Sequence, residues 1–296
     1  MEQISSAEIR ERLQRDNPWW STGAPIAESL HPKRVYFSAF KTLALNYGVK
    51  RAAILLGPRR VGKTVMLKQI VQDAITEGMP REHVFYASID TPLYANISLE
   101  RFLSYLPAAK RGENCLVVFD EIQYLKDWQA HLKDLVDSYP NVKFIASGSA
   151  AAALKLQSRE SGAGRFSDFM LPPLTFCEFL QFSDRGDLVM EDDEGLRATD
   201  ISALNAAFID YLNYGGYPEA VFNEAIRSNP DQFIRNDIID KVLLKDLPNL
   251  YGIEDIQELN KLFVHLAYNA GHECSYEKIS QHSGITKGTI GSTSST

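Results

Sequence analysis

A glycine-rich segment constrains this chain more than any other part of its sequence. Residues 57–64 read Gly-Pro-Arg-Arg-Val-Gly-Lys-Thr and match the pattern G-x-x-x-x-G-K-T of a phosphate-binding loop. Residues 52–56 form a continuous apolar run, as a buried parallel strand does, and residues 65–78 carry apolar side chains at helical spacing. Because strand, loop and helix follow one another in the required order, the sequence predicts a binding site for nucleotide phosphates.

The chemistry of this loop suggests roles for its residues. Glycines let the backbone approach an anion closely, and successive N–H groups, together with the positive end of the following helix, attract phosphate. Lys63 is expected to stabilise the charge of the β- and γ-phosphates, and Thr64 to bind Mg²⁺ through its hydroxyl. The residues expected to contact the nucleotide here are Gly57, Pro58, Arg59, Arg60, Val61, Gly62, Lys63, Thr64 and Val65.

A second apolar run, residues 115–119, ends in Asp120 and Glu121, which is the Walker B pattern. Open parallel sheets bind ligands at the carboxyl ends of their strands, so this strand and the one before the loop are expected to end as neighbours. Asp120 is then expected to hold Mg²⁺, and Glu121 to orient or deprotonate the attacking water. A strand that merely ends in two exposed acids is the alternative.

Two further positions are candidates for the same site. Residues 142–146 are expected to form another strand, and Ser147 or Ser149 at its end could contact the γ-phosphate or the water, with a helix N-cap as the alternative. Arg165 follows a glycine-interrupted segment and is a candidate arginine finger, acting in its own chain or toward a neighbour. A surface arginine without a role is the alternative.

The remaining segments predict an N-terminal arm and a helical C-terminal half. Trp19 and Trp20 are expected to anchor the arm on the body, residues 169–174 to form the last strand of the sheet, and residues 175–178 to cap the next helix. Helical periodicity without strand patterns dominates from residue 201, and residues 279–290 have helix-turn-helix character. The expected domains are an arm (1–50), an ATPase core (51–174), a helical lid (175–252) and a partial winged-helix region with a flexible tail (253–296).

Composition narrows the class of protein. The 296 residues have a net charge of −7, which argues against a surface that coats nucleic acid broadly but leaves room for a local basic patch. The three cysteines are far apart, as expected of a reducing cytosol. The N-terminus lacks a signal-peptide pattern, and no apolar stretch approaches the roughly 20 residues of a membrane span. We therefore expect a cytoplasmic protein with no membrane partner.

The combination of motifs resembles the prokaryotic AAA+-type P-loop ATPases, near the STAND and archaeal origin-recognition branch. The matching segments are residues 17–20 (Asn-Pro-Trp-Trp), 57–64, 120–123 (Asp-Glu-Ile-Gln), 147–149, 164–166, 171–179 and 214–219 (Tyr-Gly-Gly-Tyr-Pro-Glu). This resemblance implies an α/β fold with a five-stranded parallel sheet and helices on both faces, followed by an all-α lid and a winged helix within which the chain ends. It also implies that Gly216-Tyr217-Pro218 contacts the nucleotide, with Pro218 in the site, and that Arg165 is the candidate for the arginine finger.

The predicted activity is slow, Mg²⁺-dependent hydrolysis of ATP to ADP by a molecular switch, with Lys63, Glu121 and Arg165 as catalytic residues and Thr64 and Asp120 as metal ligands. Two other functions remain open. One is a nucleotide-regulated DNA-binding module that uses the helix-turn-helix segment. The other is an ADP-bound scaffold that recruits a protein partner. Assembly into a homo-oligomer is also open.

Overall fold

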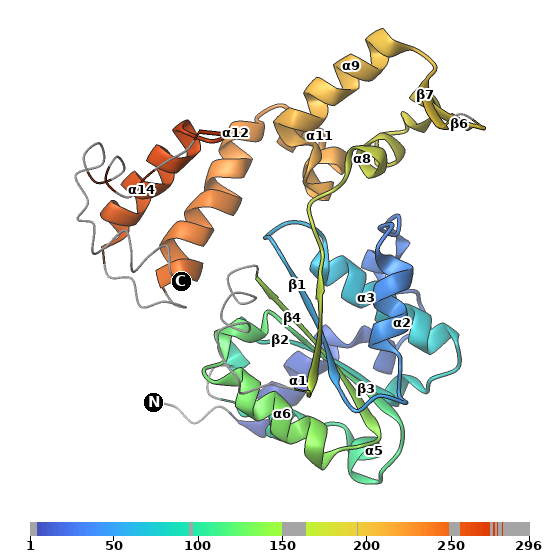
Figure 1. Cartoon of the computed structure of the whole chain (residues 1–296). Helices are drawn as coiled ribbons and strands as arrows, with labels where there is room; N and C mark the ends of the chain where they lie inside the picture. The colour runs from blue at the N-terminus through green and yellow to red at the C-terminus, as the bar shows by residue number, and fades with distance from the viewer. Residues whose placement is uncertain are drawn as a thin grey trace. The chain divides into compact units, whose positions relative to one another are not determined.

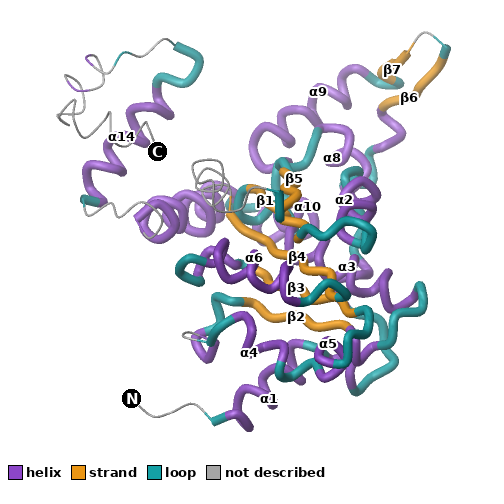
Figure 2. The backbone as a smooth tube through the Cα atoms, turned by 60° about the horizontal axis from the view of Figure 1, so that its bottom comes forward, coloured by secondary structure: helices purple, strands orange, loops and turns teal. Residues whose placement is uncertain are grey.

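A five-stranded parallel sheet lies at the centre of the protein, which is described here from a computed structural model. Its strands are β1 (Ala52–Gly57), β2 (Val84–Ser88), β3 (Cys115–Asp120), β4 (Val142–Ser149) and β5 (Phe166–Met170). They lie in the order β2-β3-β4-β1-β5, and Figure 2 shows them side by side. The predicted parallel α/β fold is confirmed. The expectation that β1 and β3 are neighbours was wrong, because β4 lies between them and the order along the chain does not fix the order in a sheet.

The structure describes residues 5–94, 97–149, 164–193, 195–248, 255–272, 275, 277 and 280. The chain divides into two compact units, the first with residues 1–153 and 159–230, the second with residues 154–158 and 231–296. The first unit therefore contains the sheet together with the segment from 175 to 230 that the sequence assigned to the lid. Among the described residues, none of the helices is both long and apolar enough to cross a membrane.

Helices cover both faces of the sheet (Figure 1). The N-terminal half contains α1 (Ser6–Asp16), α2 (Phe37–Ala44), α3 (Lys63–Thr76), α4 (Leu99–Leu103), α5 (Pro107–Lys110) and α6 (Trp128–Ser138), with short 3₁₀ turns η1 (Pro18–Trp20), η2 (Ala27–Leu30), η3 (Arg81–His83), η4 (Pro92–Tyr94) and η5 (Ile122–Tyr124). Successive side chains of a strand point to opposite sides, so each strand has side chains on both faces, and the helices on each face bury them. In β3, Leu116 and Val118 belong to the cluster with α2 and α3, whereas Phe119 contacts Phe102 of α4 on the other side.

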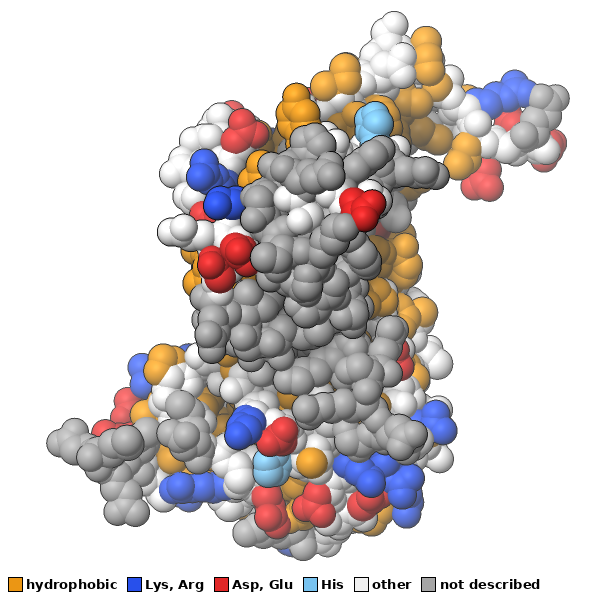
Figure 3. Space-filling view, turned by 60° about the vertical axis from the view of Figure 1, so that its left-hand side comes forward, with side chains coloured by type: hydrophobic (Ala, Val, Ile, Leu, Met, Phe, Trp, Pro, Cys, Tyr) orange, Lys and Arg blue, Asp and Glu red, His pale blue; other side chains and the backbone are white. Residues whose placement is uncertain are grey.

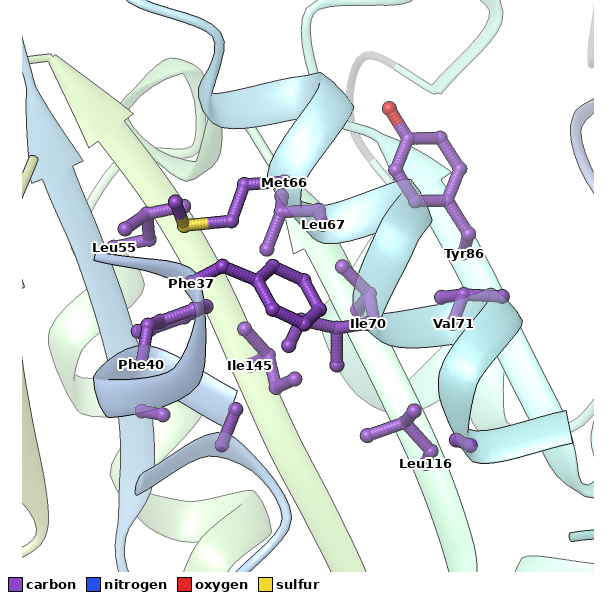
Figure 4. Close-up of a cluster of buried hydrophobic side chains, with 14 of the residues drawn as sticks. Phe37, Phe40, Leu55, Met66, Leu67, Ile70, Val71, Tyr86, Leu116 and Ile145 are labelled. Carbon is purple, nitrogen blue, oxygen red and sulfur yellow. The ribbon is translucent and has the colours of Figure 1, made fainter. Parts of the chain in front are cut away.

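The core between α2, α3 and the sheet fixes the helix that follows the glycine-rich loop. Met66 and Ile70 of α3 pack with Phe40 of α2 over Leu55 and Ile145 of the strands, as Figure 4 shows. All five side chains are at most 1% exposed, so α3 cannot rotate without opening this core. The first turn of α3 is therefore held rigidly at the carboxyl end of β1.

The N-terminal arm covers the free edge of β2. The side-chain amide of Asn17 donates to the Tyr86 carbonyl (2.8 Å), and its oxygen accepts from the Tyr86 N–H (2.6 Å). The indole N–H groups of Trp19 and Trp20 both donate to the Val84 carbonyl, at 3.1 and 2.8 Å. The prediction that the tryptophans anchor the arm is confirmed, and side chains here take the place of a neighbouring strand.

After the sheet, the first unit continues in a mostly helical segment. Its elements are α8 (Phe176–Phe182), η7 (Gly186–Leu188), β6 (Val189–Asp192), β7 (Gly195–Ala198), α9 (Ile201–Asp210), η8 (Tyr211–Gly215), α10 (Pro218–Phe222) and α11 (Glu224–Arg227). The predicted capping box at Thr175 and Glu178 opens α8 as expected. The last core strand is Phe166–Met170 rather than residues 169–174, because Pro172 and Pro173 have no N–H to donate to a ladder.

The expectation of an all-helical lid was wrong at one place. Strands β6 and β7 form an antiparallel hairpin within the segment that the sequence assigned to the helical lid. The hairpin is mostly exposed, and its charges include the ion pair Arg197–Asp192 at 3.1 Å. Figure 3 shows acidic and basic side chains mixed in this upper part of the protein, next to hydrophobic ones. These strands could not be predicted from the sequence, because a hairpin without a buried face shows no alternation of apolar and polar residues.

The second unit is helical where it is described. Its described part begins at the second residue of α12 (Pro230–Phe233) and contains η9 (Ile234–Ile239), η10 (Val242–Asp246) and α14 (Ile256–Tyr268), of which η9 and η10 are π-helical stretches. The helical periodicity predicted from residue 201 is thereby confirmed for α14. The predicted helix-turn-helix at 279–290 lies outside the described residues, apart from Ser280.

Candidate nucleotide site

The glycine-rich loop joins β1 to α3 and has the backbone that a phosphate-binding loop needs. A side chain at Gly57 is sterically excluded, since a Cβ there would lie 2.3 Å from the Leu171 carbonyl oxygen. Gly62 has φ +93°, a left-handed conformation that favours glycine, and it directly precedes the first residue of α3. The ammonium group of Lys63 folds over the loop and donates to the carbonyls of Gly57 (3.0 Å) and Pro58 (2.8 Å).

The two predicted metal ligands meet although β1 and β3 are not neighbours. The Thr64 hydroxyl in the first turn of α3 donates to Oδ2 of Asp120 at 2.7 Å. The Tyr86 hydroxyl from β2 donates to the same oxygen at 2.7 Å, and the Ser147 hydroxyl from β4 donates to Oδ1. Asp120 is 1% exposed and is thus oriented by hydroxyls from three directions. Figure 4 shows the Tyr86 hydroxyl pointing away from the hydrophobic cluster.

Glu121 follows Asp120 in an unusual backbone conformation. Its φ is +54°, and its N–H donates to Ser147 Oγ (3.0 Å) and to Asp120 Oδ1 (3.1 Å). Its carboxylate accepts a hydrogen bond from the Gln123 amide. Burial raises the pKa of the Glu121 carboxyl above its ordinary value, against the opposing charge of Lys63. A raised pKa makes a carboxylate a stronger base once it is ionised.

The other predicted loop contacts lead toward α10. Arg60 forms an ion pair with Glu219 at 2.5 Å. A Cβ on Gly62 would lie 3.8 Å from Cγ of Pro218, so this proline packs beside the loop. The Leu174 N–H donates to the Gly216 carbonyl (2.9 Å), which ties the 216–218 motif to the chain leaving β5. The structure therefore brings Pro218 to the loop, and its contact with the nucleotide stays a prediction.

Arg165 is the predicted site residue that the structure does not bring to the loop. Its carbonyl accepts from the N–H of Ala52, so it lies at the start of β1, whereas the loop follows the end of that strand. The six residues of β1 span roughly 20 Å at about 3.3 Å per residue. The guanidinium forms an exposed ion pair with Asp137 of α6. A finger role toward a neighbouring chain stays a prediction, and a role within one chain does not fit this placement.

A buried ion pair behind the loop was missed by the sequence analysis. Arg34 donates to both oxygens of Glu178, at 2.7 and 3.0 Å, and the two side chains are 5% and 0% exposed. Arg34 also donates to the Val61 carbonyl in the loop (2.8 Å) and to the carbonyls of Pro172 (3.1 Å) and Pro173 (3.2 Å). The capping-box pattern predicted only the local role of Glu178 in starting α8. Its contact with Arg34 joins residues 144 positions apart and leaves no pattern in the sequence.

A second missed residue, Lys68, lies one helical turn after Thr64. Its ammonium is 3.4 Å from the centre of the Tyr86 ring and 5.0 Å from that of Trp19. It also donates to the Asp16 carbonyl at 3.2 Å. Burial lowers the pKa of Lys68. The spacing of four residues from Thr64 was visible, but helical spacing alone does not distinguish a buried lysine from a surface one.

The oxygen ligands at this place suit Mg²⁺. Thr64 and Asp120 supply a hydroxyl and a carboxylate that already converge within 2.7 Å. Mg²⁺ prefers oxygen donors and is commonly held by one or two carboxylates, water and substrate phosphates rather than by a complete protein cage. Accordingly, the described residues contain no cluster of three or more His, Cys, Asp or Glu side chains that could hold a metal by themselves.

Comparison with known proteins agrees with this geometry. Residues 49–180 match the model of a family described as an AAA domain, and residues 205–295 match that of a domain of unknown function, DUF8612. An uncharacterized protein of Haemophilus influenzae is 26% identical over 231 residues, which are 77% of this chain and 54% of that protein. The uncharacterized protein MJ1637 of Methanocaldococcus jannaschii is 26% identical over 262 residues, which are 81% of this chain and 53% of that protein.

Among solved structures, AMPPCP-bound DnaA from Aquifex aeolicus is similar with a TM-score of 0.42 and 15% identity, covering 88% of this chain and 86% of that chain. At that score the likeness carries no conclusion of its own. The chain spans about half the length of the curated relatives it matches. The sheet order, the loop and the match to the AAA domain model together show an AAA+-like α/β fold with a phosphate-binding loop over residues 49–180. The STAND or origin-recognition branch, the winged helix and the cytoplasmic location stay predictions.

Proposed function

We propose that this protein binds ATP at the glycine-rich loop and hydrolyses it to ADP and phosphate. One observation carries the proposal: the Thr64 hydroxyl lies 2.7 Å from the Asp120 carboxylate, next to the loop that holds Lys63. A phosphate-binding loop alone would support nucleotide binding. The addition of a paired hydroxyl and carboxylate, followed at once by the half-buried carboxylate of Glu121, supports chemistry at the γ-phosphate.

Each residue has a distinct part in this mechanism. Lys63 neutralises the charge that develops on the phosphate oxygens, and the N–H groups of the loop assist it. Thr64 and Asp120 would hold Mg²⁺, which supplies charge neutralisation and alignment of the phosphates when bound. Glu121 accepts a proton from the attacking water as the water oxygen bonds to the γ-phosphorus and the bond to the ADP oxygen breaks. The ion pair between Arg60 and Glu219 links the loop to α10, so nucleotide binding is expected to affect that helix.

Glu121→Gln tests the proposal most directly. We expect this variant to bind ATP with an unchanged Kd but to hydrolyse it about 10²–10⁴-fold more slowly, because the amide cannot take the proton. Lys63→Ala is expected to weaken binding itself. Glu11→Gln, which removes the same charge from an exposed position of α1, serves as the control and should match the parent. Equal turnover in Glu121→Gln and the parent would show that Glu121 is not the base.

A further inference from the structure

We propose that Gln123 is a positioning residue for hydrolysis, which holds Glu121 with one end of its amide and the attacking water with the other. This inference deepens the proposed ATPase function and rests on it. It concerns the turn η5, Ile122–Tyr124, directly after the acids of β3.

The first observation is the hydrogen bond between Gln123 and Glu121. The amide nitrogen Nε2 of Gln123 donates to Oε2 of Glu121. This assignment of the amide is dictated by charge, since a carboxylate only accepts hydrogen bonds and would repel the amide oxygen. The contact uses one oxygen of the base and leaves Oε1 of Glu121 as the proton acceptor. Gln123 thereby restricts the direction in which that oxygen points.

The second observation is the other end of the same amide. Oε1 of Gln123 is buried and has no hydrogen-bond partner within the described part of the chain. A buried acceptor without a partner is unfavourable, so its retention beside the proposed base needs an explanation. A water molecule bound there would supply the missing donor, and a bound water requires two or more polar partners. Gln123 and Glu121 offer two acceptors, one from each side chain.

The two acceptors together fit the chemistry of attack. A water that donates one hydrogen to Gln123 and the other to Glu121 keeps its lone pairs for the γ-phosphorus. As the new oxygen–phosphorus bond forms, Glu121 takes one proton, and the electron pair of the breaking bond leaves on the terminal oxygen of ADP. Gln123 exchanges no proton. Its contribution is to fix two of the directions around the water oxygen.

The turn that carries Gln123 is fixed on both sides. Ile122 is fully buried, and the Tyr124 hydroxyl accepts a hydrogen bond from Arg59 of the glycine-rich loop at 2.8 Å. The Glu121 N–H is held by Ser147 at 3.0 Å. Gln123 thus belongs to a turn that contacts the phosphate-binding loop through Tyr124 and that holds its amide against Glu121.

The test compares Gln123→Leu with the parent. Leucine has similar bulk but neither end of the amide, so we expect kcat for ATP to fall about 10–100-fold while the Kd of a fluorescent ADP analogue changes less than about threefold. Gln14→Leu, at an exposed position of α1, is the control and should retain the parent's kcat. Gln123→Asn, which keeps the amide on a shorter side chain, is expected to show the same split and replaces the leucine variant if that one does not fold.

A readout without turnover accompanies the kinetics. Fluoroaluminate bound next to ADP imitates the γ-phosphoryl group during its transfer to water. The parent should therefore retain ADP when fluoroaluminate is present, and Gln123→Leu should release ADP faster. If the parent hydrolyses ATP and retains ADP but both Gln123 variants equal or exceed it in kcat, the inference fails and the ATPase function stands. If the parent neither hydrolyses ATP nor retains ADP with fluoroaluminate, the proposed function fails and the role of Gln123 fails with it.

Discussion

Arg34→Met should destabilise the first unit far more than its position in an irregular N-terminal segment suggests. Arg34 makes five hydrogen bonds, two to the Glu178 carboxylate and one each to three carbonyl oxygens. Methionine keeps much of the length and the apolar stem but has no donor. The variant leaves the buried carboxylate of Glu178 without its counter-ion and removes the donor to the Val61 carbonyl in the nucleotide loop.

The magnitude follows from burial. Both side chains are at most 5% exposed, and removing one partner of a buried ion pair costs about 3–5 kcal/mol, because the remaining charge has no compensation. The same change at a solvent-exposed pair costs about 0–1 kcal/mol. Lys33 provides that comparison in the neighbouring position, since its pair with Asp73 at 2.9 Å leaves the lysine 45% exposed. At roughly 2–4 °C per kcal/mol, we expect Tm to fall by about 6–20 °C for Arg34→Met and by only a few degrees for Lys33→Met.

Thermal and urea unfolding of the three proteins at pH 7 would measure the difference, and Kd for a fluorescent ADP analogue at 10 °C would report on the loop. Because Val61 loses its donor, we expect weaker nucleotide binding in folded Arg34→Met. The double variant with Glu178→Met should recover part of the lost stability, since it removes the uncompensated charge. Equal losses of stability in Arg34→Met and Lys33→Met would refute the idea that burial sets the strength of this pair.

Two further predictions concern the same region. Burial raises the pKa of Glu178, but hydrogen bonds from Arg34 and from two backbone N–H groups outweigh burial and hold the pKa below the usual 4.5. The stabilisation from this carboxylate is therefore complete above about pH 4.5 and is lost as pH falls through the folded-state pKa. Urea unfolding should accordingly show the parent losing more stability than Glu178→Gln between about pH 5 and 3. Gly57→Ala places a Cβ 2.3 Å from the Leu171 carbonyl oxygen and should cost about 1–3 kcal/mol and weaken ADP binding, whereas Gly23→Ala meets nothing nearer than 3.5 Å and should leave both unfolding and binding unchanged.

The sequence was informative wherever function depends on a local pattern. The loop, its flanking strand and helix, and the two acids at the end of β3 occupy the predicted positions because each is a short run with its own chemistry. The capping box at residues 175–178 was equally visible, since four consecutive residues carry the signal. Local patterns also predicted the tryptophan anchor, although the partner strand could not be named.

Contacts between distant segments could not be predicted in this way. The insertion of β4 between β1 and β3 depends on packing of the whole sheet, and no pairwise rule in the sequence selects it. Tyr86 is a sharper case: it lies in an apolar strand and belongs to no motif, yet its hydroxyl contacts Asp120 at the end of the next strand along the chain. Gln123 is part of the Asp-Glu-Ile-Gln segment at residues 120–123. Its role could not be predicted from that segment, because the role depends on what surrounds the nitrogen and the oxygen of its amide in the fold.

The way β2 ends the sheet has a consequence for handling this protein. An uncovered outermost strand offers its carbonyl and N–H groups to any other polypeptide, and association through such strands leads to precipitation. Here the groups of Val84 and Tyr86 are satisfied by Asn17, Trp19 and Trp20. The smallest fragment that stays monomeric should accordingly begin upstream of Asn17, well before the first strand, even though the chemistry begins at residue 57.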